Sequence, residues 1–314
     1  MKISYEDDRC VLYHGDCLDS MKSISNESVQ CCVTSPPYFG LRNYGQDGQI
    51  GIEQTPDEYV NKMVEVFREV RRVLKKDGTV WLNLGDSYVS TAQGTFNAHQ
   101  KREGNNCDIY VNFRPKVGLL PKNLIGIPWR VAFALQSDGW YLRQDIIWHK
   151  PNAMQESVID RCTKAHEYIF LLSKSQKYYY DNESIKEDAI TLPTIRNKNK
   201  EGYQADYPNC DRFSEGFRVY GKEGKRNKHS VWTVPTQPYS EAHFATYPPK
   251  LILPTILAGC PDSGVVLDPF GGSGTTALVA LKNNRKSILI EINEKYCELQ
   301  LKRLDEEIKQ PKLF

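Results

Sequence analysis

One stretch constrains the fold more than any other: residues 264–284, "GVVLDPFGGSGTTALVALKNN". A short apolar run leads into a glycine-rich turn, and a helix-forming segment follows the turn. Glycines let a backbone come close to a ligand, and free N–H groups at the start of a helix favour negative charge. The pattern therefore predicts a strand, a binding turn and a helix of an α/β fold.

The rest of the chain alternates short apolar runs with helical patterns. We expect strands over residues 10–16, 29–37, 79–86, 140–150 and 287–292, and two strands around a polar turn over 166–181. We expect helices over 55–78, 127–139, 248–260 and 293–309, the first capped by Thr55 and stopped by Gly78. This alternation is typical of a mostly parallel, Rossmann-like sheet covered by helices on both faces.

A change of texture divides the chain. Residues 182–240 are polar, with little periodicity, and the part from Arg196 to His229 holds nine Lys/Arg against five Asp/Glu. We expect residues 1–181 and 241–314 to be two halves of one α/β domain, with 182–240 as an insertion. The formal net charge of only +2 means that any contact with nucleic acid must be local.

Cysteines and apolar runs set the expected environment. The nine cysteines form no C-x-x-C pair, which favours reduced core thiols over disulfides or zinc ligands, and we expect no metal site. The purest apolar run, "LILPTILAG", is too short and too interrupted by proline to cross a membrane. We expect a soluble, cytoplasmic protein.

The glycine-rich turn also indicates a ligand. The strand after it ends at Glu291, 23 positions after Asp268, where a Rossmann-type site holds ribose hydroxyls with an acid. No Walker lysine follows the turn, and its glycines do not follow the regular G-x-G-x-x-G spacing. We expect an adenosine-bearing cofactor; the alternative is a turn that only packs a helix tightly on a strand.

A second motif, "VTSPPYFG" at residues 33–40, ends an apolar strand in a rigid corner. Together, "TSPPY" and "DPFGGSGTT" resemble the amino-methyltransferases of DNA, which use S-adenosylmethionine to modify cytosine N4 or adenine N6. The family motif is (D/N/S)-P-P-(Y/F), here in its Ser form. A catalytic motif ahead of the cofactor turn resembles the β group, in which the insertion recognises the target sequence.

The resemblance implies how the corner acts. The lone pair of an exocyclic amine is delocalised into its ring, so the amine is a poor nucleophile. Acceptors on its N–H groups, by resemblance the Ser35 side chain and the Pro36 carbonyl, would free that lone pair. Pro36 and Pro37 would hold both acceptors rigid, and Tyr38 would stack on a base flipped out of the duplex.

The same resemblance assigns the cofactor pocket. The expected residues are Asp16, His243, Asp268, Pro269, Phe270, Gly271, Gly272, Gly274, Thr275, Thr276 and Glu291. Asp16 would lie near the adenine or only cap a turn, and His243 would close the pocket or be structural. Trp148 and Asn152 would border the base pocket or belong to the core. Asp86 would serve the site or cap a loop.

The basic insertion fits double-stranded DNA, with a solvated loop as the alternative. The candidate DNA contacts are Lys198, Lys200, Arg212, Arg218, Lys222, Lys225, Arg226 and Lys228. A cognate restriction endonuclease and a second copy of the chain are further partners to test.

The sequence favours a site-specific DNA methyltransferase acting on cytosine N4, because the motif has the Ser form. Adenine N6 is the first alternative. A nicotinamide-dependent oxidoreductase could use the same glycine turn but would leave the Ser-Pro-Pro-Tyr segment without a role. A DNA-binding protein without catalytic activity is the remaining alternative.

Overall fold

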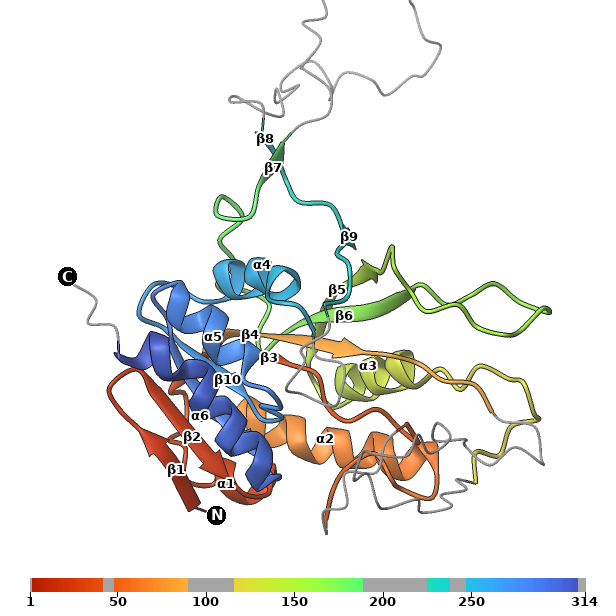
Figure 1. Cartoon of the computed structure of the whole chain (residues 1–314), viewed down its shortest axis with the longest axis horizontal. Coiled ribbons are helices and arrows are strands. Elements are labelled where there is room, and N and C mark those ends of the chain that lie inside the picture. The colour runs from red at the N-terminus through yellow and green to blue at the C-terminus, as the bar shows by residue number, and fades with distance from the viewer. Residues whose placement is uncertain (1, 42–47, 90–115, 189–224, 238–246, 310–314) are drawn as a thin grey trace, which may run out of the picture. The chain divides into compact units, whose positions relative to one another are not determined.

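A computed structural model of the chain describes residues 2–41, 48–89, 116–188, 225–237 and 247–309 (Figure 1). The chain divides into two compact units, one made of Met1–Asp181 with Ser230–Phe314 and the other of Asn182–His229. In the smaller unit, β7 (Glu187–Asp188) pairs antiparallel with β8 (Lys225–Arg226). Residues from Ser230 onward belong to the larger unit, where β9 (Val231–Thr233) pairs with β5.

The larger unit is built on a nine-stranded sheet. In spatial order the strands are β1 (Lys2–Glu6), β2 (Cys10–His14), β11 (Lys286–Glu291), β10 (Val265–Asp268), β3 (Val29–Thr34), β4 (Leu74–Leu84), β6 (His166–Ser173), β5 (Tyr141–His149) and β9. The neighbours from β2 to β4 are all parallel, whereas β1–β2, β4–β6 and β6–β5 are antiparallel. The prediction of a mostly parallel sheet is confirmed.

Helices form two separate groups (Figure 1). In one group, α2 (Pro56–Val73) packs against both α1 (Cys17–Met21) and α3 (Ile127–Ser137). In the other, α5 (Thr275–Lys282) packs against both α4 (Pro249–Gly259) and α6 (Glu294–Lys309). Two consecutive residues of β11 contact different helix groups. Leu289 packs in a hydrophobic cluster with residues of α5, and Ile290 packs in another hydrophobic cluster with residues of α2. Side chains alternate across a strand, so helices cover both faces, as predicted.

Helix α2 shows both a correct and a wrong prediction. The Thr55 side chain caps it by accepting from the Glu58 N–H, and the Glu58 side chain accepts in turn from the Thr55 N–H. The expected end at Gly78 is wrong, since the helix ends at Val73 and the following residue, Leu74, already pairs with β3. Gly78 serves packing instead: a Cβ there would lie 2.5 Å from the Leu74 Cγ.

Three short elements of the larger unit lacked a sequence signal, as did β7 and β8 of the smaller unit, and one expected strand is wrong. Strands β1 and β9 and the five-residue helix α1 have polar or very short sequences. The second strand expected within 166–181 does not form, because this segment bonds irregularly instead: the Tyr179 N–H donates to the Asp77 carbonyl and the Asp181 N–H to that of Ala258.

The sheet order creates a crevice between β10 and β3. The chain leaves β10 through α5 toward β11 on one side, and leaves β3 through α2 toward β4 on the other. Ligands of open α/β sheets bind at such a switch point, outside the carboxyl ends of the strands. Here the buried Thr34 hydroxyl donates to Asp268 Oδ1 at 2.6 Å, so the two sequence motifs meet directly beside the crevice.

None of the helices in the described part of the chain is both long and apolar enough to span a membrane.

Candidate active site

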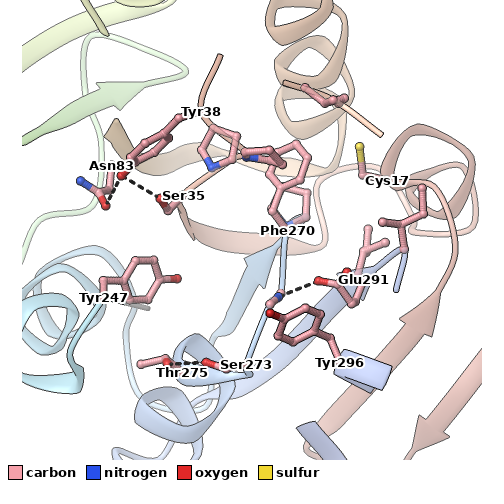
Figure 2. Close-up of a pocket in the computed structure, with 18 of the residues that line it drawn as sticks. Cys17, Ser35, Tyr38, Asn83, Tyr247, Phe270, Ser273, Thr275, Glu291 and Tyr296 are labelled. Atoms are coloured by element: carbon pink, nitrogen blue, oxygen red, sulfur yellow. Dashed lines mark hydrogen bonds between the residues drawn. The ribbon is translucent and has the colours of Figure 1, made fainter. Parts of the chain in front are cut away.

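A cavity of about 670 Å³ opens at the crevice and is lined by both sequence motifs (Figure 2). Figure 2 shows Ser35, Tyr38 and Asn83 at one part of its wall and Glu291 and Tyr296 at another. The residues singled out in the sequence that line it are Asp16, Ser35, Pro36, Pro37, Tyr38, Trp148, Asn152, Pro269, Phe270, Gly271, Gly272, Thr275 and Glu291. The rigid corner and the glycine turn therefore share one cleft.

The corner is held by hydrogen bonds on both sides. The Tyr59 hydroxyl donates to the Pro37 carbonyl at 2.9 Å, and the Ser35 hydroxyl donates to the Tyr38 oxygen at 3.3 Å. Among the described residues no donor reaches the Pro36 carbonyl. An acceptor held rigidly beside a cavity, with no partner in this part of the protein, is available to a ligand.

Glu291 stands at the wall beside the glycine turn. The Gly272 N–H donates to its Oε2 at 2.8 Å, and the Asn293 N–H donates to its Oε1 at 2.9 Å. Burial is the main cause that raises the pKa of Glu291 to about 7, and the backbone bonds oppose it. A Cβ at Gly271 would lie 2.8 Å from the Gln300 Nε2 of α6 and 3.1 Å from the Leu289 Cβ of β11, so glycine lets the turn pack closely against both elements.

Three of the expected cofactor residues support the turn without lining the cavity: Asp268, Gly274 and Thr276. The buried Asp268 carboxyl accepts from four donors, namely the Thr34, Tyr247 and Thr276 hydroxyls and the Phe270 N–H. Burial raises its pKa, although these bonds oppose the shift. Asp268 therefore anchors the turn to β3, and its oxygens are used within the protein.

Several lining residues were not assigned from the sequence: Asn83, Lys150, Glu167, Tyr247 and Tyr296. Asn83 lies in "LNLGDSY", three residues before Asp86, and Lys150 lies in "IIWHKPN", between Trp148 and Asn152, so both stand beside residues that the sequence did single out. Glu167 is the second residue of β6, and no local pattern marks it.

These residues form a polar network. Glu167 makes an ion pair with Lys150, and the Asn83 amide donates to Glu167 Oε2 at 3.1 Å. The Tyr38 hydroxyl donates to the same oxygen at 2.7 Å. The Lys150 ammonium also lies 4.2 Å from the centre of the Trp148 ring, a cation–π contact. A charged, largely buried pair thus stands directly behind the rigid corner.

Two aspartates singled out in the sequence cap helices in the structure. Asp16 caps α1 by accepting from the Asp19 N–H at 3.0 Å, and it also lines the cavity. Asp86 accepts from the N–H groups of Gly126 and Ile127, so it caps the start of α3 and is absent from the cavity wall.

Trp148 and Asn152 combine structural roles with a place at the cavity. The buried Trp148 indole donates to the Val234 carbonyl at 2.8 Å. Asn152 exchanges two hydrogen bonds with the backbone of Thr236. Both therefore hold the segment after β9, and both line the cavity.

Six residues of the predicted site fall in other parts of the chain. His243, Lys198, Lys200, Arg212, Arg218 and Lys222 lie outside the described residues. Within the smaller unit, Lys225 pairs with Asp188, and Arg226 and Lys228 pair with Glu187.

The described cysteines are free thiols, and all except Cys162 are buried. Burial raises the pKa of Cys10, Cys17, Cys260 and Cys297 to about 12. Within the described ranges, no group of three or more His, Cys, Asp or Glu side chains is arranged to hold a metal ion.

Known proteins similar to this chain include two type II methyltransferases. A family model described as DNA methylase, of the N6/N4 type, matches residues 29–302. M.SmaI of Serratia marcescens is 46% identical over 297 residues, which are 94% of this chain and 90% of that protein. M.Cfr9I of Citrobacter freundii is 45% identical over 298 residues, which are 94% of this chain and 88% of that protein.

Solved structures share the fold. The cytosine-N4-specific PvuII DNA methyltransferase aligns with a TM-score of 0.64 at 18% identity, over 100% of this chain and 92% of that one. The complex of M1.HpyAVI with S-adenosylmethionine aligns with a TM-score of 0.53 at 17% identity, over 94% and 99%.

The family match spans both motifs, the sheet has the architecture of methyltransferases, and both motifs line one cavity. An oxidoreductase or a protein without catalytic activity is therefore no longer a competing interpretation. The chain belongs to the N6/N4 DNA methylase family and is an S-adenosylmethionine-dependent DNA amino-methyltransferase.

Proposed function

We propose that this enzyme methylates N4 of a cytosine within a specific sequence of double-stranded DNA. The observation that carries the proposal is Ser35, the first residue of the Ser-Pro-Pro-Tyr segment, at the wall of the cavity. In the family that the sequence resembles, the Ser form goes more typically with cytosine, and the Asp and Asn forms with adenine. Adenine N6 is the second candidate.

The base must leave the duplex to reach Ser35, because a stacked and paired base cannot enter a cavity of this kind. We infer that the Ser35 Oγ and the Pro36 carbonyl accept hydrogen bonds from the two N–H groups of the target amine. This draws the nitrogen toward tetrahedral geometry and turns its lone pair toward the methyl donor. Because Pro36 and Pro37 restrict the backbone, orientation supplies most of the catalysis.

The residues around the glycine turn fit S-adenosylmethionine, which supplies a methyl group on a positively charged sulfur. Gly272 leaves the backbone of the turn open to close approach, since a Cβ there would meet only the Phe270 carbonyl at 3.8 Å, and both Gly271 and Gly272 line the cavity. We assign the ribose hydroxyls to Glu291 and the adenine end to Asp16. The carboxylates at the wall also favour a cationic ligand electrostatically.

For DNA we propose residues 182–240 as the target-recognition region. The described cations there have acidic partners, and contact with phosphates would replace those partners.

We also propose that the enzyme works in the cytoplasm beside a restriction endonuclease of the same sequence specificity, since M.SmaI and M.Cfr9I are type II methyltransferases. A homodimer is a further proposal, to be tested by light scattering.

The product decides the target base. Unmethylated plasmid DNA is incubated with the enzyme and S-adenosylmethionine, digested to nucleosides and analysed by mass spectrometry. We expect N4-methyldeoxycytidine, and N6-methyldeoxyadenosine as the sole product would contradict the proposal. Single-molecule sequencing of the same DNA identifies the methylated sequence.

A further inference from the structure

Glu167 ends a chain of hydrogen bonds that begins at Ser35. The Ser35 hydroxyl donates to the Tyr38 oxygen at 3.3 Å, and the Tyr38 hydroxyl donates to Glu167 Oε2 at 2.7 Å. Figure 2 shows the first link and places Asn83 beside it. The side chains of Glu167 and Lys150 are only 16% and 18% exposed. A largely buried charged pair therefore sits at the end of a path that leads to the proposed target amine.

This series of hydrogen bonds runs from donor to acceptor in one direction, from Ser35 toward Glu167, because of the kinds of groups in it. The Tyr38 hydroxyl has one hydrogen and two acceptors within reach, Glu167 Oε2 at 2.7 Å and Asn83 Oδ1 at 3.2 Å. An ionised carboxylate can only accept and makes the stronger bond, so this hydrogen is directed to Glu167. The Tyr38 oxygen then accepts from Ser35. As a result the hydrogen of Ser35 points toward Tyr38, and the lone pairs of its oxygen are left to accept from a substrate amine.

We propose that Glu167 is a positioning residue for Ser35 and the final protein acceptor of the proton released when the target amine is methylated. This inference rests on the proposed function, since it needs an amine held at Ser35. Lys150 and Asn83 hold the carboxylate in place for both tasks.

The proton balance is simple. When the nitrogen has formed its bond to the methyl carbon, and the carbon–sulfur electron pair has stayed on sulfur, the nitrogen carries a positive charge and one surplus hydrogen. That proton passes to the Ser35 oxygen as the Ser35 proton passes to Tyr38 and the Tyr38 proton passes to Glu167. Both hydroxyls are restored, the methylated amine is neutral, and the protonated Glu167 later loses its proton to solvent.

The groups around Glu167 hold its carboxylate in place. Lys150 after β5, Tyr38 after β3 and Asn83 on β4 face its carboxyl group. Lys164 and His166 precede Glu167 in the sequence, and burial lowers the pKa of both. A variant that keeps a carboxylate at this position should therefore keep part of the rate, whereas an amide should not.

The test uses single-turnover methylation of duplex DNA at saturating S-adenosylmethionine and DNA. Glu167→Gln keeps the shape of the side chain but cannot take the proton, and Tyr38→Phe breaks the series of hydrogen bonds in its middle. We expect either variant to lower the rate at neutral pH by roughly 100-fold, the lower range for a proton-transfer group. We expect the double variant to be no slower than the single ones, and Glu167→Asp, which keeps a carboxylate, to recover part of the rate.

The matched control is Glu69→Gln, which removes a carboxylate paired with Arg72 on α2, away from the cavity. Its single-turnover rate should equal that of the original enzyme. Calorimetric binding of S-adenosylmethionine shows whether the variants are folded, and we expect less than a twofold change in affinity.

The outcomes separate the two proposals. A Glu167→Gln enzyme that keeps the original rate, or a Glu167→Asp enzyme that is no faster than Glu167→Gln, overturns the role of Glu167 while methylation of cytosine stands. An unsubstituted enzyme that methylates adenine alone contradicts the proposed function instead, and the rates of the Glu167 variants still report on the role of this residue.

Discussion

Single atoms decide the chemistry at the residue scale. The proposed target amine is served by one hydroxyl and one carbonyl, Ser35 Oγ and Pro36 O, and neither belongs to a helix or strand. Their positions depend on the restricted backbone of two prolines and on two hydrogen bonds. The Tyr59 hydroxyl donates to the Pro37 carbonyl, and the Ser35 hydroxyl donates to the Tyr38 oxygen. A substitution that removes one acceptor should therefore change the reaction without changing the fold.

The first prediction concerns Ser35. Ser35→Ala should lower the single-turnover rate by roughly 100-fold, because an acceptor on the amine is lost, and change the affinity for S-adenosylmethionine less than twofold. Radiolabelled methyl transfer and calorimetry measure the two quantities. Ser25→Ala removes an exposed hydroxyl and serves as the control. Equal losses in rate and cofactor affinity would count against the assigned role.

The second prediction concerns pH and Glu291. Its pKa is about 7 because burial disfavours the charged form, whereas ribose hydroxyls donate to that charged form. We therefore expect S-adenosylmethionine to bind the ionised carboxylate, and between pH 8 and pH 6 its Kd should rise roughly tenfold as protons compete. Calorimetry at several pH values measures this. Glu291→Gln should bind weakly at both pH values, and an unchanged slope in this variant would assign the effect to another group.

At the scale of elements, the segments after β3 and β4 fit each other closely. The Tyr38 ring packs on Gly85, just after β4, and a Cβ there would lie 2.6 Å from the Tyr38 Cε2. The ring can stack on a base only if this contact and its hydroxyl bond to Glu167 hold its orientation.

This contact gives the third prediction. Gly85→Ala should push the Tyr38 ring out of place and lower methylation of duplex DNA by at least roughly tenfold, since small misplacements of positioning groups are costly. Binding of S-adenosylmethionine should be unchanged.

Tyr38→Ala should show a smaller loss on DNA whose target base is already unpaired, and an identical loss on both substrates would argue against stacking after flipping.

The elements also show what a sequence can and cannot predict. The glycine turn and the proline corner were predictable because each is a local pattern, read from consecutive residues. Glu167 was not, because its place depends on two antiparallel pairings, with Trp148 opposite it on β5 and Tyr168 opposite Leu84 of β4. The end of α2 was missed for a similar reason: Leu74 leaves the helix to pair with β3, a contact that helix propensity does not record.

At the scale of the whole molecule, Asp268 joins the two halves of the catalytic unit. Asp268→Ala would leave four donors without this acceptor, and two of them, the Thr34 and Thr276 hydroxyls, are buried. We expect the free energy of unfolding to fall by at least roughly 2 kcal/mol, because each unsatisfied buried group is costly. Denaturant unfolding measures this. Asp262→Ala, which removes an exposed partner of Arg285, should cost less than about 1 kcal/mol, and an equal loss in both variants would contradict the anchoring role.

The lateral pairing of β10 with β3 has a consequence for the ancestry of such enzymes. Thr34 and Asp268 touch although they are 234 positions apart, and no stretch of backbone has to run directly from one to the other. A gene rearrangement that moved the last strand–helix–strand unit ahead of the first would keep these side-by-side neighbours, provided that the new connections reach. Permuted chains can thus inherit the same chemistry.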